Sequence, residues 1–238
     1  MWAKYLMTDK DRQIQTLSTI IARSNLAGML GKSYGGDRNL YEALGYKTDL
    51  VYQDFVTQFL RQDIASAIIE RPVKVTWSGD LSIIESTEGE TTELESGWVQ
   101  LERDLKLKSK FIRLDKLTGL GRYGVLLMGF DDIKTIQDFI KPVTKGKRKL
   151  MYVRPLGESS ATISTWETDV NNERYGLPLI YDIVLTQPTS GSATISGLSS
   201  TIRVHYTRVI HVVENAMESE VEGRPRLEVV FNRLQDLE

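Results

Sequence analysis

The sequence predicts an α+β fold in which a helical N-terminal half is followed by a β-rich half. Before about residue 145, apolar residues recur mainly at the three- and four-residue spacing of amphipathic helices. After it, short runs rich in β-branched and aromatic residues alternate with turns of Gly, Ser, Asn and Pro. We therefore expect four parts: an arm with a Gly-rich connector (1–36), a mainly helical part with a short hairpin (37–144), a β-rich part (145–222) and the start of a helix (223–238).

The arm is expected to hold one helix, because its apolar residues follow helical spacing until four glycines interrupt them. The apolar residues are Ile14, Leu17, Ile20 and Ile21, and the glycines are Gly28, Gly31, Gly35 and Gly36.

Two helices are predicted next. Asp37 is a suitable N-cap for the first, and Gly45 stands where a left-handed C-terminal residue belongs. The second helix begins at Asp49 or Asp54 and is expected to stop at Arg71-Pro72, since proline interrupts helical hydrogen bonding. Beyond this stop, alternation over 73–77 predicts a strand that pairs with 81–84 as a hairpin.

The acidic run Glu85–Glu95 is expected to be a solvated loop that opens a helix. The apolar stripe of that helix includes Trp98, for which truncation to Ala would cost about 3 to 5 kcal/mol if it lies in the core. A further helix is predicted to end at Gly119, and the apolar run Val125–Phe130 has the length of a strand. Asp132 is predicted to cap a helix that carries Ile133, Ile136 and Phe139.

The β-rich part contains five predicted strands. The chain ends in a predicted helix whose apolar repeat starts at Leu227 and whose first turn contains Pro225. No stop signal follows Leu237, so we expect the helix to continue beyond Glu238. The predicted strands are Leu150–Val153, Ala161–Trp166, Leu179–Leu185, Thr201–His205 and Val209–Val213.

Composition excludes several classes of function. The formal net charge of −2 and pI near 5.9 give no global attraction to nucleic acid or anionic membrane. Because the chain has no cysteine, it has neither disulfides nor thiolate chemistry. No apolar run approaches the roughly 20 residues of a membrane span, so no membrane partner is expected.

Two glycine motifs resemble nucleotide sites without the context those sites need. Gly119-Leu-Gly121-Arg-Tyr-Gly124 matches G-x-G-x-x-G, but here the helix precedes the glycines and the strand follows them. We interpret it as a helix-to-strand turn that needs positive φ. Gly31-Lys32-Ser33 resembles a Walker A ending, yet Leu26 stands at the first glycine position. No cofactor is predicted.

The histidines and acidic pairs also fall short of a catalytic or metal site. His205-Tyr-Thr207 satisfies H-x-T, half of a two-histidine phosphodiesterase signature, whereas His211 lacks the hydroxyl partner. On an unbroken strand the two histidines would share a face. Asp131-Asp132 lacks a third acidic partner for Mg²⁺, and Asp169 with its neighbouring asparagines is typical of a turn. We predict no catalytic, cofactor-binding or metal residue.

One local charge feature remains, a polybasic loop around Gly146. It could track DNA phosphates or contact another subunit, and if many copies surrounded an axis it would form a basic ring. The alternative is a solvated hairpin tip. The contact residues are Lys145, Lys147, Arg148 and Lys149, with Lys141 nearby.

Several segments resemble a family of portal proteins of tailed double-stranded-DNA bacteriophages. The resemblance is strongest in the last third of the chain and extends into the N-terminal half. The segments are Arg154–Trp166, Arg174–Ile183, His205–His211 and Gly223–Glu238, preceded by Asp37–Gly45 and Arg61–Pro72.

The resemblance implies a structural subunit without enzymatic activity or cofactor. Portal proteins form a ring, commonly of twelve subunits, at one capsid vertex. The terminase drives DNA through this ring, the neck and tail attach to it, and the major capsid protein surrounds it. This chain would be the wing portion, with stem, clip and crown after Glu238. It would lie in the virion and, during assembly, in the host cytoplasm.

Two other functions compete with this interpretation. Relatives of this N-terminal family are associated with two-histidine phosphodiesterases that degrade cyclic oligonucleotides of host defence, so the chain could be the N-terminal portion of such an enzyme, with its catalytic part downstream. A binding module that forms no ring is the other alternative.

Overall fold

The computed structural model describes residues 10, 13–21, 41, 44–85, 91–184 and 201–237. The chain divides into two compact units, Met1–Leu50 and Val51–Glu238. In the first unit residues 13–21 are helical, which confirms the helix predicted for the arm, and Gly45 has the predicted positive φ of 78°. The Gly-rich connector, the Walker-like tripeptide and the Asp37 cap lie outside the described residues.

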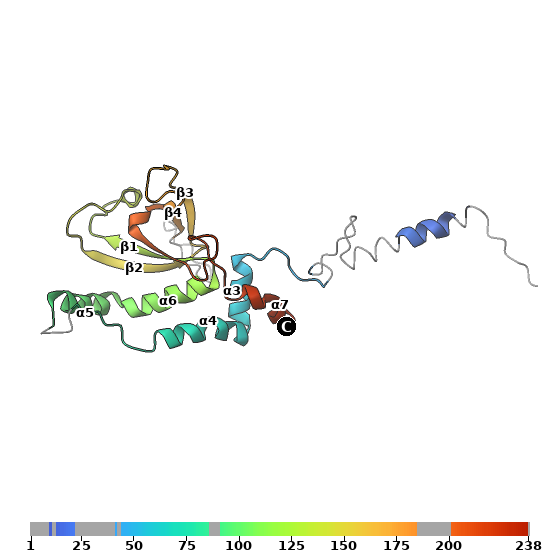
Figure 1. The fold of residues 1–238 in the computed structure, drawn as a ribbon, viewed down its shortest axis with the longest axis horizontal. Helices are drawn as coiled ribbons and strands as arrows, with labels where there is room; N and C mark the ends of the chain where they lie inside the picture. Colours follow the sequence, from blue (N-terminus) through green and yellow to red (C-terminus); the bar gives the residue numbers. More distant parts are fainter. Residues whose placement is uncertain are drawn as a thin grey trace, which may run out of the picture. The chain divides into compact units, whose positions relative to one another are not determined.

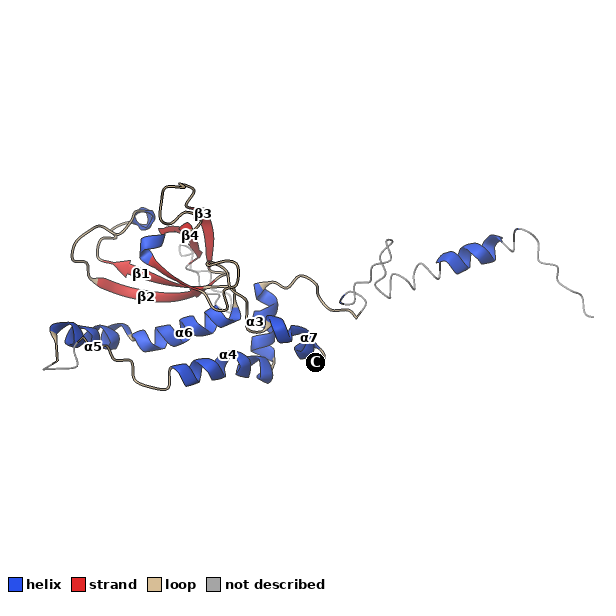
Figure 2. Ribbon diagram, in the orientation of Figure 1, coloured by secondary structure: helices blue, strands red, loops and turns tan. Residues whose placement is uncertain are grey.

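The second unit is an α+β domain, as the sequence predicts (Figure 2). Its helices come first and its strands follow. The main helices are α3 (Tyr52–Arg61), α4 (Asp63–Thr76), α5 (Glu93–Leu105) and α6 (Leu107–Leu120). The strands are β1 (Gly124–Phe130), β2 (Leu150–Gly157), β3 (Ala161–Trp166), β4 (Pro178–Val184), β5 (Thr201–His205) and β6 (Val209–Val212).

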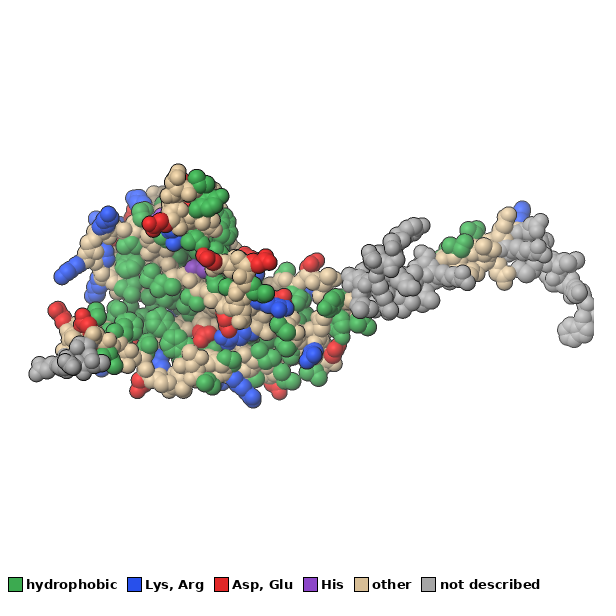
Figure 3. Space-filling model, in the orientation of Figure 1, with side chains coloured by type: hydrophobic (Ala, Val, Ile, Leu, Met, Phe, Trp, Pro, Cys, Tyr) green, Lys and Arg blue, Asp and Glu red, His purple; other side chains and the backbone are tan. Residues whose placement is uncertain are grey.

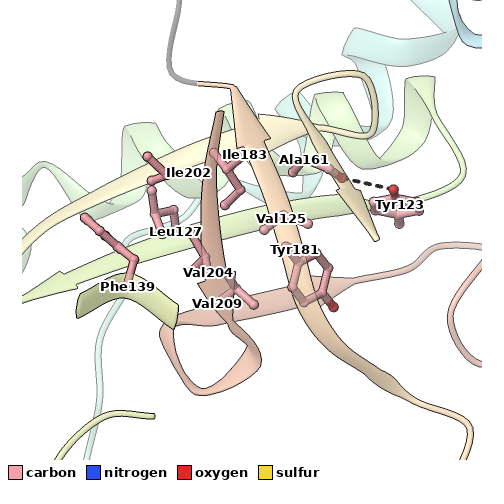
Figure 4. Close-up of a cluster of buried hydrophobic side chains, with 10 residues drawn as sticks. All are labelled: Tyr123, Val125, Leu127, Phe139, Ala161, Tyr181, Ile183, Ile202, Val204 and Val209. Carbon is pink, nitrogen blue, oxygen red and sulfur yellow. Dashed lines mark hydrogen bonds between the residues drawn. The ribbon is translucent and has the colours of Figure 1, made fainter. Parts of the chain in front are cut away.

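The strands form two three-stranded antiparallel sheets, ordered β2-β1-β6 and β3-β4-β5. Consecutive strands therefore change sheet twice, once between β2 and β3 and once between β5 and β6. The inner faces of the two sheets enclose a hydrophobic core (Figure 4). Tyr123 closes one end of this core, and its hydroxyl donates to the Ala161 carbonyl oxygen at 3.0 Å.

Strand β1 is covered on both faces, because its side chains alternate between two clusters. Val125 and Leu127 point into the core between the sheets, whereas Leu126 packs with Leu114 of α6. Helix α6 runs beneath the first sheet, and α4 lies on the far side of α6 (Figure 1). Burial from both sides explains why β1 is a continuous apolar run.

The predicted stop at Arg71-Pro72 and the hairpin after it are wrong. Helix α4 continues through Pro72 to Thr76, and residues 81–84 form no strand. Ala65, Ile69 and Val73 lie on one face of the helix and are each 0% exposed. Burying this continuous stripe outweighs the hydrogen bond that Pro72 removes.

The break between helices comes earlier, at Gln62, which has extended backbone angles (φ −110°, ψ 133°). The single helix predicted from Asp49 or Asp54 is therefore two helices, α3 and α4. The Gln62 side chain donates to the Leu234 carbonyl oxygen at 2.7 Å, which ties this bend to the C-terminal segment.

The glycine motif does join a helix to a strand, from α6 to β1, but none of its glycines has positive φ. They are required by close packing instead. A Cβ at Gly119 would lie 2.8 Å from the Arg226 guanidinium, and one at Gly124 would overlap the Thr118 hydroxyl. The prediction of a turn was right, and its stated cause was wrong.

The C-terminal helix begins later than predicted. Residues 224–226 are not helical, and a 3-10 helix η3 (Glu228–Val230) leads into the short helix α7 (Phe231–Gln235). Arg226 holds the preceding backbone against α6, because its amide donates to the Gly119 carbonyl oxygen at 2.9 Å. Phe231 then packs edge-on against Phe55 of α3, with ring centroids 5.8 Å apart.

Candidate functional site

The polybasic residues lie in a long connection, residues 131–149, between the paired strands β1 and β2. The ladder ends at Phe130 opposite Leu150, and the amide of Asp131 donates to the Lys149 carbonyl oxygen at 3.1 Å. Within the connection, a 3-10 helix η1 (Ile136–Ile140) buries Phe139 in the core between the sheets. The connection is thus anchored at its end and at its middle.

A buried ion pair fixes the base of this connection. The Arg208 side chain is 2% exposed, and its two terminal nitrogens donate to the two Asp132 carboxylate oxygens at 2.8 Å each. Arg208 Nε also donates to the Lys141 carbonyl oxygen at 2.9 Å. Asp132 is therefore an ion-pair partner and not the predicted helix cap, which is Thr135. The sequence could not reveal this pair, because its members are 76 residues apart.

Hydroxyl groups extend the same network toward the basic residues. The Thr144 hydroxyl donates to Asp132 at 3.0 Å, and the Val143 amide donates to the Thr207 hydroxyl oxygen at 2.9 Å. Hydrogen bonds from Arg208 hold the pKa of Asp132 well below its usual range, which keeps the carboxylate charged. The backbone up to residue 144 is consequently fixed from several sides.

The structure places the four predicted contact residues in the last part of this connection, directly before β2. We call residues 145–149 the basic loop; all four of its charged side chains are exposed. Gly146 has a φ of 114°, a backbone conformation that favours glycine. Within the described part of the chain, no ion pair involves these four side chains. Figure 3 shows Lys and Arg side chains gathered over the β1–β2 connection.

The two histidines do not share a strand face. His205 ends β5 in one sheet, the 3-10 turn η2 (Tyr206–Arg208) follows, and His211 lies in β6 of the other sheet. The His205 Nδ1 lies 3.0 Å from the Thr207 hydroxyl oxygen, so the H-x-T pattern forms a local turn contact. Burial lowers the pKa of both imidazoles.

His211 is a packing residue. Its Nδ1 lies 3.1 Å from the Tyr181 hydroxyl, its Nε2 lies 2.8 Å from the Val221 carbonyl oxygen, and its ring stacks on Tyr123 at 4.8 Å. Both ring nitrogens of His211 are engaged in these contacts, and Val213 stands where the second motif of a two-histidine phosphodiesterase would have Ser or Thr. The described residues therefore give no support to the phosphodiesterase alternative.

The described residues contain no group of three or more His, Cys, Asp or Glu that could hold a metal ion. The turn predicted at Asp169 is present, since the Asn171 amide donates to Asp169 Oδ1 at 3.0 Å. In the same described ranges, no helix is long and apolar enough to cross a membrane.

Sequence reasoning missed an apolar cavity of about 450 Å³ between the helices and strand β6. Trp77 forms part of its wall, and the Trp77 indole donates to Asp115 at 2.9 Å. The walls come from α6, β1, β6 and the residues that follow α4 and β6, so no local sequence pattern indicates the cavity. The lining residues include Phe111, Leu114, Leu126, Ile210 and Val213.

Arg226 was also missed. Its guanidinium donates to Glu214 at 2.8 Å, to Asp115 at 3.2 Å and to the Ile69 carbonyl oxygen at 3.1 Å. It thereby joins the segment before α7 to helices α4 and α6, beneath Gly119.

The described residues thus form a layered α+β domain that presents four exposed cations before β2. A family model described as phage portal protein matches residues 54–238, which is most of the chain. The chain therefore belongs to the phage portal protein family, as the sequence resemblance implied. Members of this family are structural components of the virion. No curated protein matches the chain.

Proposed function

We propose that this chain is the wing portion of a subunit of the portal ring at one capsid vertex, and that double-stranded DNA enters and leaves the capsid through this ring. The terminase and the neck and tail proteins would attach to it, and the major capsid protein would surround it. The family match over residues 54–238 carries this proposal. The chain would act in the virion after assembly in the host cytoplasm.

The arrangement of the described residues is consistent with a conduit. The histidines take part in structural contacts, and the buried Arg208 and Glu158 form ion pairs with Asp132 and Arg122. A net charge of −2 suits a channel wall, because a wall that bound DNA tightly would slow its passage.

Measuring the assembly state tests the ring. The full-length protein at micromolar concentration would be analysed by native mass spectrometry and negative-stain electron microscopy. We expect closed rings with a central channel, and the mass would give the subunit number, for which the proposal is twelve. A protein that stays monomeric under these conditions would overturn the proposal.

A further inference from the structure

Two loops of opposite charge lie at opposite ends of the first sheet. The basic loop directly precedes β2, whose first residue Leu150 pairs with Phe130 at the end of β1. The segment 214–222, which we call the acidic loop, follows the end of β6, where Val212 pairs with Gly124 at the start of β1. The seven residues of β1 therefore separate the loops by about 20 Å. The acidic loop contains Glu214, Glu218, Glu220 and Glu222 and no basic residue.

The acidic loop is held in a defined shape. The Ser219 hydroxyl oxygen accepts hydrogen bonds from the amides of Val221 and Glu222 at 3.1 and 3.0 Å. Val221 is 5% exposed, and its carbonyl oxygen contacts His211. A Cβ at Gly223 would overlap the Glu214 carbonyl oxygen, so the loop closes tightly.

The acidic side chains divide into two groups. Glu214 and Glu222 form ion pairs within the domain, with Arg226 and Arg122. Glu218 and Glu220 are exposed, and within the described ranges no ion pair involves either of them. Figure 3 shows red side chains away from the blue cluster that covers the β1–β2 connection.

We propose that the basic loop of one copy binds the acidic loop of the next copy, in a head-to-tail contact. The inference rests on the proposed function for the closure of this contact into a ring. A head-to-tail interface joins two different surfaces of the same chain and yields a ring when the rotation between copies closes. Complementary charges at its two sides fix the orientation of neighbours and accelerate their encounter.

Two observations favour a second copy over DNA as the partner of the basic loop. DNA contact alone would give no role to the acidic loop, whereas a second copy uses both loops. In addition, the acidic loop is held by the Val221–His211 contact, and the residues that lead to the basic loop are held by Arg208 and Asp132. Surfaces fixed before binding lose less conformational freedom when they associate.

The experiment uses the full chain and two charge-reversed variants. One carries Lys147→Glu and Arg148→Glu, which cancels the net positive charge of its basic loop, because Lys145 and Lys149 remain. The other carries Glu218→Lys and Glu220→Lys, which reverses the two acidic side chains that form no ion pair within the described part of the domain. The matched control reverses Arg103→Glu and Arg113→Glu on the exposed surfaces of α5 and α6. Assembly is followed by mass photometry and analytical ultracentrifugation, and folding by circular dichroism.

We expect each loop variant alone to need a concentration roughly tenfold higher or more for half-assembly, because two attractive pairs become repulsive. An equimolar mixture of the two variants should assemble again, since the new Glu side chains of one variant can then face the new Lys side chains of the other. The control should assemble like the original chain. Raising the salt from 0.05 to 0.5 M should weaken assembly of the original chain, as the Debye length falls below about 5 Å.

Failure of the inference and failure of the proposed function give different results. If the original chain forms rings and both variants do as well, the loop contact is wrong while the portal ring stands. If the original protein forms open, salt-sensitive linear oligomers that only the loop reversals abolish, the loop contact stands and the proposed portal ring is wrong. If Lys147→Glu/Arg148→Glu abolishes binding to a labelled 30-base-pair duplex and leaves assembly unchanged, the basic loop contacts DNA and the inference is overturned.

Discussion

Arg208 and Asp132 fix, from inside the domain, the segment 141–144 that leads to the basic loop. Both side chains are almost fully buried, at 2% and 5% exposure, and the guanidinium uses its remaining donors on the carbonyl oxygens of residues 141 and 142. A buried pair gains little net stability over an apolar pair, but removing one partner leaves a charge without compensation. The pair therefore serves to specify the backbone that precedes the basic loop.

This pair makes stability depend on acid pH. Because the pKa of Asp132 is lower in the folded protein than its unfolded value of about 3.9, its stabilisation is complete above about pH 5 and decreases as pH falls below about 4. Asp132→Asn should cost about 3 kcal/mol at pH 7 and make the loss between pH 5 and 3 smaller. Urea unfolding at several pH values would measure both effects.

Asp104→Asn, on the exposed surface of α5, is the matched control and should change neither the stability at pH 7 nor its acid dependence by more than about 0.5 kcal/mol. An Asp132→Asn variant that loses stability with acid as steeply as the original chain would contradict the role given to the ion pair.

At the scale of elements, helix α4 is stabilised by the burial of its apolar side chains although its sequence contains a proline that predicts a helix end. Pro72 lacks the amide that would donate to the Ile68 carbonyl oxygen, yet Ile69 and Val73 on either side are fully buried. Pro72→Ala should therefore stabilise the domain by about 1 to 2 kcal/mol. The free energy gained from the restored helical hydrogen bond exceeds the free-energy cost of the larger conformational entropy of the unfolded chain. Thermal unfolding would show a higher Tm.

Val75→Ala in the same helix is the control, because Val75 is 74% exposed and should change stability by no more than about 0.5 kcal/mol. A lower Tm for Pro72→Ala would mean that the proline fits its site better than an alanine.

Helix α5 is attached more loosely than its apolar stripe suggests. None of its residues is fully buried, and Trp98 packs only partly against the cluster formed by α6 and the first sheet. Trp98→Ala should thus cost about 2 kcal/mol and not the 3 to 5 kcal/mol of a core tryptophan. Chemical denaturation measures the difference, with Val99→Ala on the exposed side as control. A cost above 4 kcal/mol would show that α5 is integral to the core.

At the scale of the whole molecule, the family match and the structural division nearly coincide. The match begins at residue 54, and the second compact unit begins at Val51. A fragment of residues 51–238 should therefore keep the Tm of the full chain to within about 3 °C, since a loss of 1 kcal/mol corresponds to about 2 to 4 °C at this size. Differential scanning calorimetry of both proteins tests this. A fall of more than about 8 °C would show that residues 1–50 stabilise the domain.

Local chemistry was sufficient to predict the α+β class, the strands β3 and β5 to the residue, and the exposed basic loop. Strands were predictable because β-branched runs between turn residues describe a half-buried pleated surface wherever it lies in the fold. The basic loop was predictable because five neighbouring residues that include four cations cannot be buried.

Prediction from local sequence failed where residues distant in the sequence provide the stabilising contacts. The sequence by itself determined the class, most element types and the family. Only the tertiary structure decided that α4 continues through Pro72 and that Asp132 pairs with Arg208. It also decided that the glycines of 119–124 leave space for the side chains of Arg226 and Thr118, and that loops of opposite charge lie at the two ends of one sheet. The reason is physical: burial, ion pairing and strand register depend on which surfaces meet, and those surfaces are brought together by folding.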